Sequence, residues 1–272
     1  MWTPRWHSWP NGPFAINWDS PQAKDLAAWW PFGNEGGTFP VRDMRAKYNL
    51  AASGAPTWIC DPRRGNVISF DADTEYLKIS STPVTAVPLT LCCWAYNTSL
   101  TTIAVTVEIS SDGEDSAFGI GCDGVTAGDP AWAIAKTGGS VATGAAISTT
   151  GMTVNKWHHL CATFASATSR AIYIDGGSKG TSAVSRAPAN LNIVFLGNDC
   201  VWGDPGSFPW PGRLSDVRIY NRVLSDTEVL ALYDTRTRWD LYLPVQRFWA
   251  GLAPAAGGGV PRQMMHYKRM RQ

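Results

Sequence analysis

The sequence predicts an all-β protein built from many short strands. Only 17% of its 272 residues are charged, and 26 glycines and 18 prolines provide frequent turns. Only five of the 22 acidic residues are glutamates, which are good helix formers, so the composition disfavours long helices. Because 44% of the residues are hydrophobic, the chain can build a sizeable core, and an intrinsically disordered chain is excluded.

Short apolar or alternating runs, separated by Gly, Pro, Asn and Asp, fill the chain from residue 26 to residue 234. The run at 89–96 is apolar on both sides, with Leu91 and Cys93 on one and Cys92 and Trp94 on the other, which predicts a central strand. The spacing of the runs is typical of a β-sandwich. We expect strands at residues 26–32, 66–70, 76–79, 89–96, 103–109, 117–121, 131–135, 157–164, 171–175, 192–197 and 213–220.

Two local signals predict a hairpin and a helix. Asp175-Gly176 is a sequence typical of a tight hairpin turn. Ser225 and Glu228 have the spacing of a capping box, in which each side chain accepts the backbone amide hydrogen of the other residue. The apolar residues that follow predict a short helix of roughly two turns.

The chain divides into three zones: an N-terminal arm at 1–25, a central domain at 26–234 and a C-terminal arm at 235–272. Neither arm has the periodicity of a strand or a helix, and the sequence APAAGGG at 253–259 is typical of a flexible spacer. We therefore expect the aromatic side chains of the arms to pack on a partner or on sister copies. The residues predicted to make this contact are Trp2, Trp6, Trp9, Trp18, Trp239, Arg247 and Trp249.

The charge is unevenly distributed although the net charge is only +1. From Arg236 onward there are seven basic residues and one acid, a net +6, so the remainder carries −5. This arm suggests docking on an acidic partner or a neighbouring copy; the alternative is a solvated tail. The arm mixes its basic residues with Trp249, His266 and Tyr267 but matches no nucleic-acid reader motif, so nucleic acid is not expected as a partner.

Apolar runs are too short for a signal peptide or a membrane span, so we expect synthesis in a cytoplasm, without a signal peptide and without membrane insertion. The spacing of the cysteines does not favour disulfides or zinc, and we expect most of them to be small buried hydrophobic residues. The cysteines are Cys60, Cys92, Cys93, Cys122, Cys161 and Cys200.

Three blocks in the central zone resemble the laminin G-like, or concanavalin A-like, jelly-roll family. The last block, at 208–234, contains RLSDVRIYNRVLSDTEV, and the middle block contains WHHLCATF followed by AIYIDG. The resemblance implies an antiparallel jelly-roll β-sandwich with one short C-terminal helix and extended arms at both ends. The blocks are 26–37 with Asp43 and 65–80, then 89–96 with 157–180, then 208–234.

Catalysis is not expected. Glycoside hydrolases that share this jelly roll place paired carboxylates in an E-x-D-x-E strand, which this sequence lacks. The nearest pattern, Asp71 to Glu75, falls where the family has a structural turn. His158 and His159 are adjacent within a strand motif, and neither has a nucleophilic partner indicated by the sequence.

Calcium is the only cofactor that the resemblance implies, because many relatives bind the ion with loop carboxylates and carbonyls. For Asp216, which matches one of two acids in the family motif, a structural hydrogen bond is the alternative to a metal role. No EF-hand spacing occurs. The candidate ligands are Asp43, Asp71, Asp73 and Asp216.

Glycan binding is predicted at the loops that carry Trp132, Trp202 and Trp210 beside the acids Asp112 and Asp129. Exposed aromatic rings with flanking polar groups suit sugar stacking. Tryptophan is also common in protein interfaces and in sandwich cores, and these alternatives stay open.

The whole arrangement, with WDLYLPVQRFW at 239–249, is similar to virion-associated proteins of tailed bacteriophages. This resemblance implies a non-catalytic virion protein that decorates a capsid or tail, contacts other virion proteins through its arms and presents its jelly roll to a cell-surface glycan. The alternative is a free lectin-like carbohydrate-binding module. The arms separate the two hypotheses, since a free lectin has no use for aromatic arms that it cannot bury.

Overall fold

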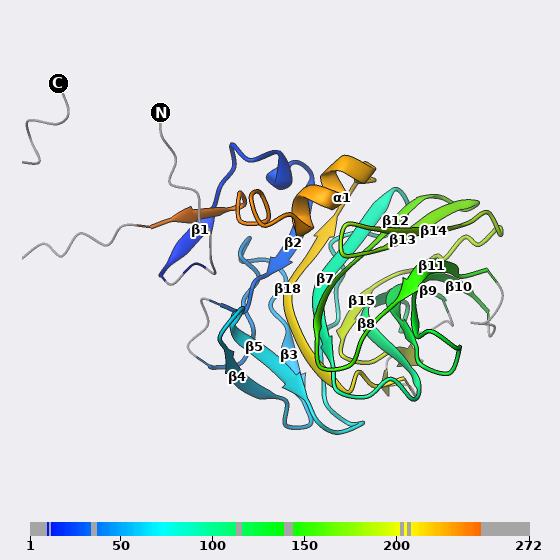
Figure 1. The fold of residues 1–272 in the computed structure, drawn as a ribbon, viewed down its shortest axis with the longest axis horizontal. Helices are drawn as coiled ribbons and strands as arrows, with labels where there is room; N and C mark the ends of the chain where they lie inside the picture. Colours follow the sequence, from blue (N-terminus) through cyan, green and yellow to red (C-terminus); the bar gives the residue numbers. More distant parts are fainter. Residues whose placement is uncertain are drawn as a thin grey trace, which may run out of the picture.

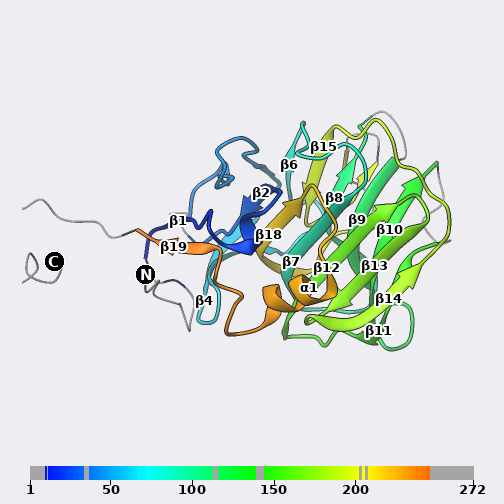
Figure 2. The ribbon, with the colours of Figure 1, turned by 90° about the horizontal axis from the view of Figure 1, so that it is seen from above.

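The computed structural model describes residues 10, 12–33, 37–112, 116–138, 144–201, 204–205 and 208–245. Two antiparallel sheets pack face to face, and a short helix lies against the outer face of one of them (Figures 1 and 2). The predicted all-β sandwich with one helix is confirmed for these residues.

The first sheet has seven strands in the spatial order β11, β10, β9, β8, β15, β6, β3. Their bounds are Ala146–Gly151 (β11), Pro130–Thr137 (β10), Ser116–Asp123 (β9), Ile103–Ser110 (β8), Ile193–Leu196 (β15), Tyr76–Ile79 (β6) and Ala51–Ser53 (β3).

The second sheet has eight strands in the order β14, β13, β12, β7, β18, β5, β4, with β2 also paired to β18. Their bounds are Gly177–Ser182 (β14), Ser169–Ile174 (β13), Trp157–Ser166 (β12), Leu89–Asn97 (β7), Gly212–Tyr220 (β18), Gly65–Phe70 (β5), Thr57–Asp61 (β4) and Leu26–Trp30 (β2). The remaining elements are β1 (Phe14–Ile16), β19 (Tyr242–Pro244), β16 (Cys200–Val201), β17 (Asp204–Pro205), a 3-10 turn η1 (Pro21–Ala23) and the helix α1 (Asp226–Tyr233).

Strand β7 is central in its sheet, as its two apolar faces predict. Leu91 and Cys93 point into the large core between the sheets, while Cys92 and Trp94 face outward and are also buried. The outer face of the second sheet is therefore covered by other parts of the chain.

The predicted hairpin and capping box are both present. Asp175 and Gly176 have φ values of 53° and 74°, which only a few residue types adopt, and they connect β13 to β14. At the start of α1, the Glu228 amide donates to Ser225 Oγ at 3.3 Å and the Ser225 amide donates to Glu228 Oε2 at 2.9 Å. These two bonds satisfy amides that the first turn of a helix leaves without partners.

Parts of both predicted arms cover the outer face of the second sheet. Strands β1 and β19 pair antiparallel, with Phe14 opposite Pro244, and lie together at one end of the molecule (Figures 1 and 2). Trp239 and Leu241 pack with them around Trp29. The prediction that Trp239 is unburied and free for a partner is wrong, because only 4% of its surface is exposed.

Trp18, by contrast, is 62% exposed. The other predicted arm contacts lie outside the described residues: Trp2, Trp6, Trp9, Arg247 and Trp249.

A bulge in β18 turns Asp216 toward this covered face. The register between β18 and β7 shifts between Ser215 and Arg218, and Asp216 has a φ of 51°. Its carboxylate accepts the Trp29 indole N–H at 2.7 Å and binds Arg218 through two hydrogen bonds of 2.9 and 2.8 Å. Arg218 also donates to Gln22 Oε1 at 2.7 Å, which joins the N-terminal segment to the sheet. Of the two roles considered for Asp216, the structural one accounts for both carboxylate oxygens.

Four cysteines are buried as predicted: Cys92, Cys93, Cys122 and Cys161. Burial raises the pKa of the Cys93 and Cys122 thiols to about 12, so neither is a thiolate near neutral pH. Cys60 is exposed on β4, an edge strand of the second sheet, which agrees with a prediction made for most of the cysteines and not for all of them.

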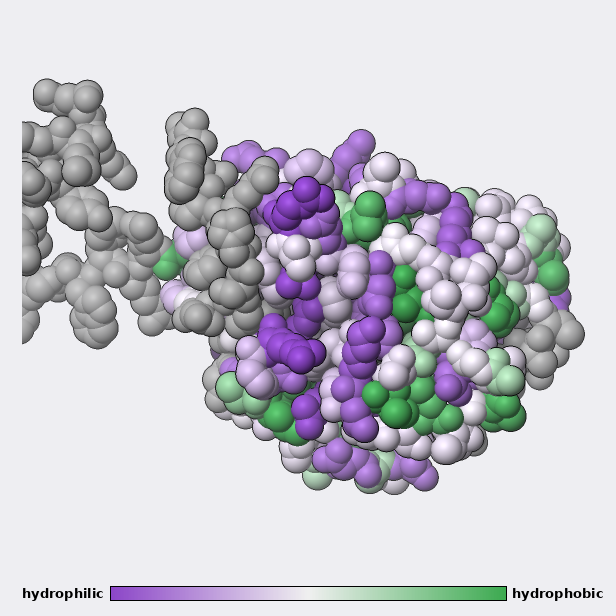
Figure 3. All heavy atoms as spheres, viewed as in Figure 1, coloured by the Kyte–Doolittle hydropathy of each residue, from purple (hydrophilic) through white to green (hydrophobic). Residues whose placement is uncertain are grey.

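Helix α1 has eight residues, and no helix within the described ranges is long and apolar enough to cross a membrane. On the face that Figure 3 displays, apolar side chains form separate groups with hydrophilic residues between them. This face therefore presents no single large apolar patch.

Candidate functional site

The predicted sugar-stacking tryptophans do not form a site. Trp132 is 4% exposed and packs with Val105 and Ile134 on the first sheet, and Trp210 is 1% exposed in the core. Both side chains are buried among apolar residues. The prediction that their rings are exposed for sugar stacking is therefore wrong at these two positions. The side chain of Trp202 lies outside the described residues.

The two acids predicted beside these tryptophans, Asp112 and Asp129, lie in loops. Asp112 is exposed and exchanges two hydrogen bonds with Asn192, of 2.9 and 2.7 Å. Asp129 is half-buried in the turn before β10 and has a φ of 49°.

The remaining predicted metal ligands act in loops. Asp43 is 2% exposed, and its carboxylate accepts the backbone amides of Trp29 at 2.9 Å and of Lys47 and Tyr48 at 3.2 Å. It therefore holds the loop before β3 against the free edge of β2. No group of three or more His, Cys, Asp or Glu side chains able to hold a metal occurs within the described ranges.

The Asp71 to Glu75 segment is a turn, as the sequence indicates. Glu75 Oε2 accepts the Asp71 amide at 2.6 Å and the Ala72 amide at 3.3 Å, and Asp71 accepts the Ser69 hydroxyl at 3.1 Å. Asp73 is exposed. The carboxylate of Glu75 thus stabilises the turn rather than facing a second carboxylate across a substrate site.

His158 and His159 are both 3% exposed. The His158 ring is hydrogen-bonded to Asp175 at 2.9 Å, and its Nε2 accepts the Thr153 amide at 3.1 Å. Burial lowers the pKa of His159 to about 3, which keeps that ring neutral. The burial of both rings therefore indicates a structural role for the two histidines.

A first cleft, here called the Trp18 cleft, has a volume of about 390 Å³ and lies beside the free edge of β2. Trp18 follows β1, in a turn held by the Asn17 amide, which donates to the Leu241 carbonyl at 2.8 Å. Arg45 donates to the Leu26 and Ala27 carbonyls at 2.5 and 3.2 Å and so covers the edge of the strand. The lining residues are Trp18, Ala23, Asp25, Leu26, Ala27, Arg45, Lys47, Tyr48, Pro83 and Asn221.

The Trp18 cleft combines one exposed indole with groups that donate and accept hydrogen bonds. Asp25, Arg45, Lys47 and Asn221 are all exposed. An apolar ring surrounded by such groups suits a flat, hydroxyl-rich ligand.

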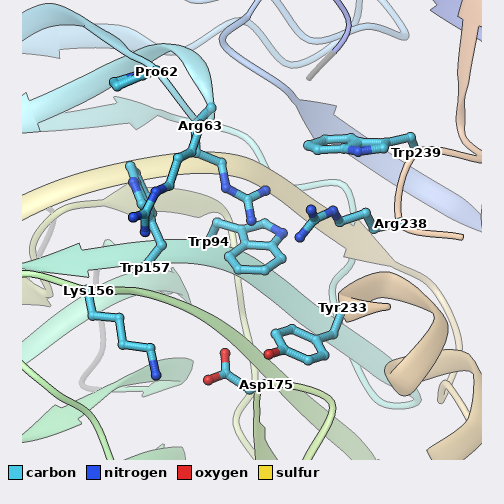
Figure 4. Close-up of a pocket in the computed structure, with 10 residues that line it drawn as sticks. Pro62, Arg63, Trp94, Lys156, Trp157, Asp175, Tyr233, Arg238 and Trp239 are labelled. Atoms are coloured by element: carbon cyan, nitrogen blue, oxygen red, sulfur yellow. The ribbon is translucent and has the colours of Figure 1, made fainter. Parts of the chain in front are cut away.

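A second cleft, here called the Arg64 cleft, has a volume of about 380 Å³ and lies over the outer face of the second sheet (Figure 4). Side chains reach it from the β4–β5 turn, from β7 and β12, from the β13–β14 turn, from the end of α1 and from the C-terminal segment. The lining residues are Pro62, Arg63, Arg64, Trp94, Lys156, Trp157, Asp175, Tyr233, Arg238 and Trp239.

The β4–β5 turn places Arg64 in this cleft. Asp61 Oδ1 accepts the backbone amides of Arg63 at 2.8 Å and Arg64 at 3.1 Å, which tightens the turn. Asp61 Oδ2 accepts the Trp157 indole N–H at 3.0 Å and lies 3.7 Å from Arg213. Arg63 is exposed as a result, whereas Arg64 is 3% exposed.

The Arg64 guanidinium lies 3.2 Å from the centre of the Trp94 ring. Trp94 in turn stacks on Tyr233 with a centroid separation of 5.8 Å. Arg238 points toward Trp94 and lies 5.8 Å from that ring and 5.1 Å from Trp239 (Figure 4). The floor of the cleft is therefore aromatic, with two guanidinium groups above it.

Burial, and then the nearby charge of Arg238, lower the pKa of Arg64 to about 9. Arg64 Nη1 has no hydrogen-bond partner within the described part of the chain. Nearby carboxylates already accept other donors. These are Asp61 from Trp157 (3.0 Å), Asp175 from His158 (2.9 Å) and Asp216 from Arg218 (2.9 and 2.8 Å).

Most of the residues that line this cleft were not among the site residues predicted from the sequence. Arg64 belongs to a Pro-Arg-Arg-Gly turn, which in a sequence reads as a solvent-exposed basic hairpin. The available signal was the repeated occurrence of tryptophan on outward-facing strand positions, such as Trp94 and Trp157, because buried aromatic rings on an outer face need a cover.

The β-sandwich fold is that of the concanavalin A-like class, which includes lectins and glucanases. Residues 71–230 match the laminin G domain family described as the Concanavalin A-like lectin/glucanases superfamily, and the chain belongs to this family. The family resemblance that the sequence indicated is confirmed. A search of curated proteins finds no match to the chain.

Similar solved structures share the fold at low sequence identity. Domain 4 of AbnA, an extracellular GH43 arabinanase from Geobacillus stearothermophilus in complex with arabinotriose, has a TM-score of 0.59 and 17% identity, with 77% of this chain and 98% of that chain covered. Trypanosoma rangeli sialidase with 2,3-difluorosialic acid has a TM-score of 0.57 and 14% identity, covering 89% and 36%. The binding domain of Paraclostridial Mosquitocidal Protein 1 has a TM-score of 0.56 and 14% identity, covering 78% and 52%.

Proposed function

We propose that the chain is a non-catalytic carbohydrate-binding protein whose sugar site is the Trp18 cleft. The observation that carries this proposal is the 62% exposure of Trp18 at a cleft of about 390 Å³. A tryptophan left this exposed in a folded domain suits a ligand with an apolar face. A sugar ring has such a face, and its hydroxyl groups suit Asp25, Arg45 and Asn221.

The complex of the arabinanase domain with arabinotriose supplies the first probe for this site. We expect arabinotriose, or another neutral trisaccharide of a panel with galactotriose, cellotriose and maltotriose, to bind the full chain in isothermal titration calorimetry. Trp18→Ala should weaken this binding about tenfold or more, because the loss of one stacked ring costs about 1.4 kcal/mol. Trp18→Phe should retain part of the affinity, since it keeps an aromatic plane.

The matched control is Phe39→Ala, which removes another exposed aromatic side chain that does not line the cleft. This variant should bind the sugar as the wild-type chain does. The proposal fails if no neutral glycan binds at millimolar concentration, or if Trp18→Ala binds as tightly as the wild-type chain.

Absence of catalysis is the second part of the proposal. Asp71 and Glu75 stabilise a turn, and a buried carboxylate such as Asp216 is bound to Arg218, so none of the three is positioned as an acid facing a nucleophile. Incubation of the chain with a panel of polysaccharides should therefore release no reducing ends. Turnover that disappears in Asp71→Asn or Asp73→Asn would contradict this expectation.

The second candidate function is attachment to a virion as a capsid or tail protein. One observation favours it: β1 and β19 pair antiparallel with Phe14 opposite Pro244, so the start of β1 and the end of β19 lie at the same end of the domain. The experiment is incorporation into particles of a chain that lacks 246–272.

A further inference from the structure

We propose that the Arg64 cleft binds a sugar that carries a carboxylate, such as a uronic acid or a sialic acid residue. This site shares no lining residue with the Trp18 cleft, so the proposal does not rest on the function proposed above. Its ligand class is acidic, whereas the Trp18 cleft is assigned a neutral glycan.

The net positive charge of the cleft favours an anionic ligand. Four basic side chains and one carboxylate line it, a formal charge of +3. The single carboxylate, Asp175, accepts hydrogen bonds from His158 and from the His159 amide, both at 2.9 Å. These donors within the protein partly compensate the negative charge of Asp175, so positive charge predominates in the cleft.

The strongest single feature is the burial of Arg64 with no direct ion pair to a carboxylate among the residues that the structure describes. A buried guanidinium is unfavourable unless it is paired and hydrogen-bonded. Arg64 lines the cleft although it is only 3% exposed, and its Nη1 has no partner within the described part of the chain. A ligand oxyanion in the cleft supplies the missing acceptor, and the planar guanidinium matches the two oxygens of a carboxylate.

The volume of the cleft and the side chains that line it favour a sugar over a small inorganic ion. The cleft volume of about 380 Å³ lies at the lower end of the range for small-molecule sites. Trp94 and Trp157 are buried and form the base of the cleft, whereas the half-buried Tyr233 offers apolar surface to the carbon skeleton of a ring. Lys156 and Arg63 are exposed at the cleft and can bind hydroxyl groups (Figure 4).

The test compares acidic sugars with neutral forms of the same shape, using the full chain at low ionic strength in calorimetry. Trigalacturonate is paired with its methyl ester, and 3′-sialyllactose is paired with lactose, so that the two pairs separate a uronic acid from a sialic acid as the source of the carboxylate. We expect at least one acidic probe to bind about tenfold tighter than its neutral partner. Equal affinity within both pairs overturns the proposal, and so does equally tight binding of a pentaglutamate peptide.

Arg64→Gln is expected to abolish the preference for the acidic probe while it leaves binding of a neutral trisaccharide unchanged. Arg213→Gln is the matched control, because Arg213 also lies over an aromatic ring, 4.9 Å from the centre of Tyr96, but outside the cleft. If Arg64→Gln shows no cooperative melt, the acidic preference is measured in Arg238→Gln and Lys156→Gln instead. These two variants are expected to fold because Arg238 is half-buried and Lys156 is exposed. Folded variants that all keep the acidic preference overturn the proposal.

Discussion

Arg218→Met is expected to lower the free energy of unfolding by about 3–5 kcal/mol, because it leaves the Asp216 carboxylate buried without its cation. Both residues are almost fully buried, with side-chain exposures of 2% and 3%, and they share two hydrogen bonds. Arg218 also donates to Gln22, so the variant loosens the N-terminal segment as well. Urea unfolding followed by tryptophan fluorescence measures the loss.

A double variant separates the unpaired charge from the loss of contacts. Asp216→Asn combined with Arg218→Met removes both charges, and asparagine tolerates the positive φ of 51° at this position. We expect the double variant to be more stable than Arg218→Met alone, since replacing a buried pair costs less than breaking it.

Arg213→Met, which removes a half-buried arginine 3.7 Å from Asp61, serves as a control and should cost at most about 1 kcal/mol. A loss of less than about 1 kcal/mol in Arg218→Met would contradict the role given to the Asp216–Arg218 pair.

The same pair makes stability depend on acid pH. Burial opposes ionisation of Asp216, but the charge and hydrogen bonds of Arg218 prevail and hold its pKa below the ordinary value. A carboxyl whose pKa is depressed by folding contributes stability above its unfolded pKa of about 3.9, and this contribution is lost as the pH falls through the folded value. Between pH 4 and pH 2 the wild-type chain should therefore lose more stability than the double variant.

Local features of the fold were predictable from the sequence because local residues determine them. The Ser225 cap, the Asp175-Gly176 turn and the two apolar faces of β7 each depend on a few neighbouring residues. Trp132 shows the limit of this reasoning. Its run alternates correctly, so a strand was predicted, but alternation does not reveal whether the outward side of a strand is covered by other residues.

The candidate sites depend on contacts between distant segments. Arg64 is buried because Trp94, Trp157 and Arg238 approach it from strands and a segment far along the chain. Trp239 is buried because the C-terminal segment returns to pair with β1, over 220 residues earlier. Neither pairing leaves a periodic signal in the sequence, so each reads there as an exposed turn or an exposed arm.

Deletion of residues 235–272 is expected to abolish cooperative folding, although the sequence predicts that 26–234 is the whole domain. Trp239, Leu241 and Tyr242 are at most 4% exposed and cover Trp29 on the outer face of the second sheet. Burying each such side chain contributes roughly 2–3 kcal/mol, and three of them approach the total stability of a typical domain, about 5–15 kcal/mol. The shortened chain, heated and followed by circular dichroism, should show no cooperative transition.

Deletion of 246–272 alone should have the opposite outcome, because it leaves β19 and its contacts with β1 in place. The deleted sequence contains five basic residues and no acidic one, which suits docking on an acidic surface. We expect this chain to melt as the full chain does but to lose oligomerisation or incorporation into particles, with the loss mimicked by raised salt in the full chain. Normal oligomerisation and incorporation of this shortened chain would favour the alternative, a free lectin-like module. Loss of the cooperative melt would mean that residues beyond 245 also stabilise the folded domain.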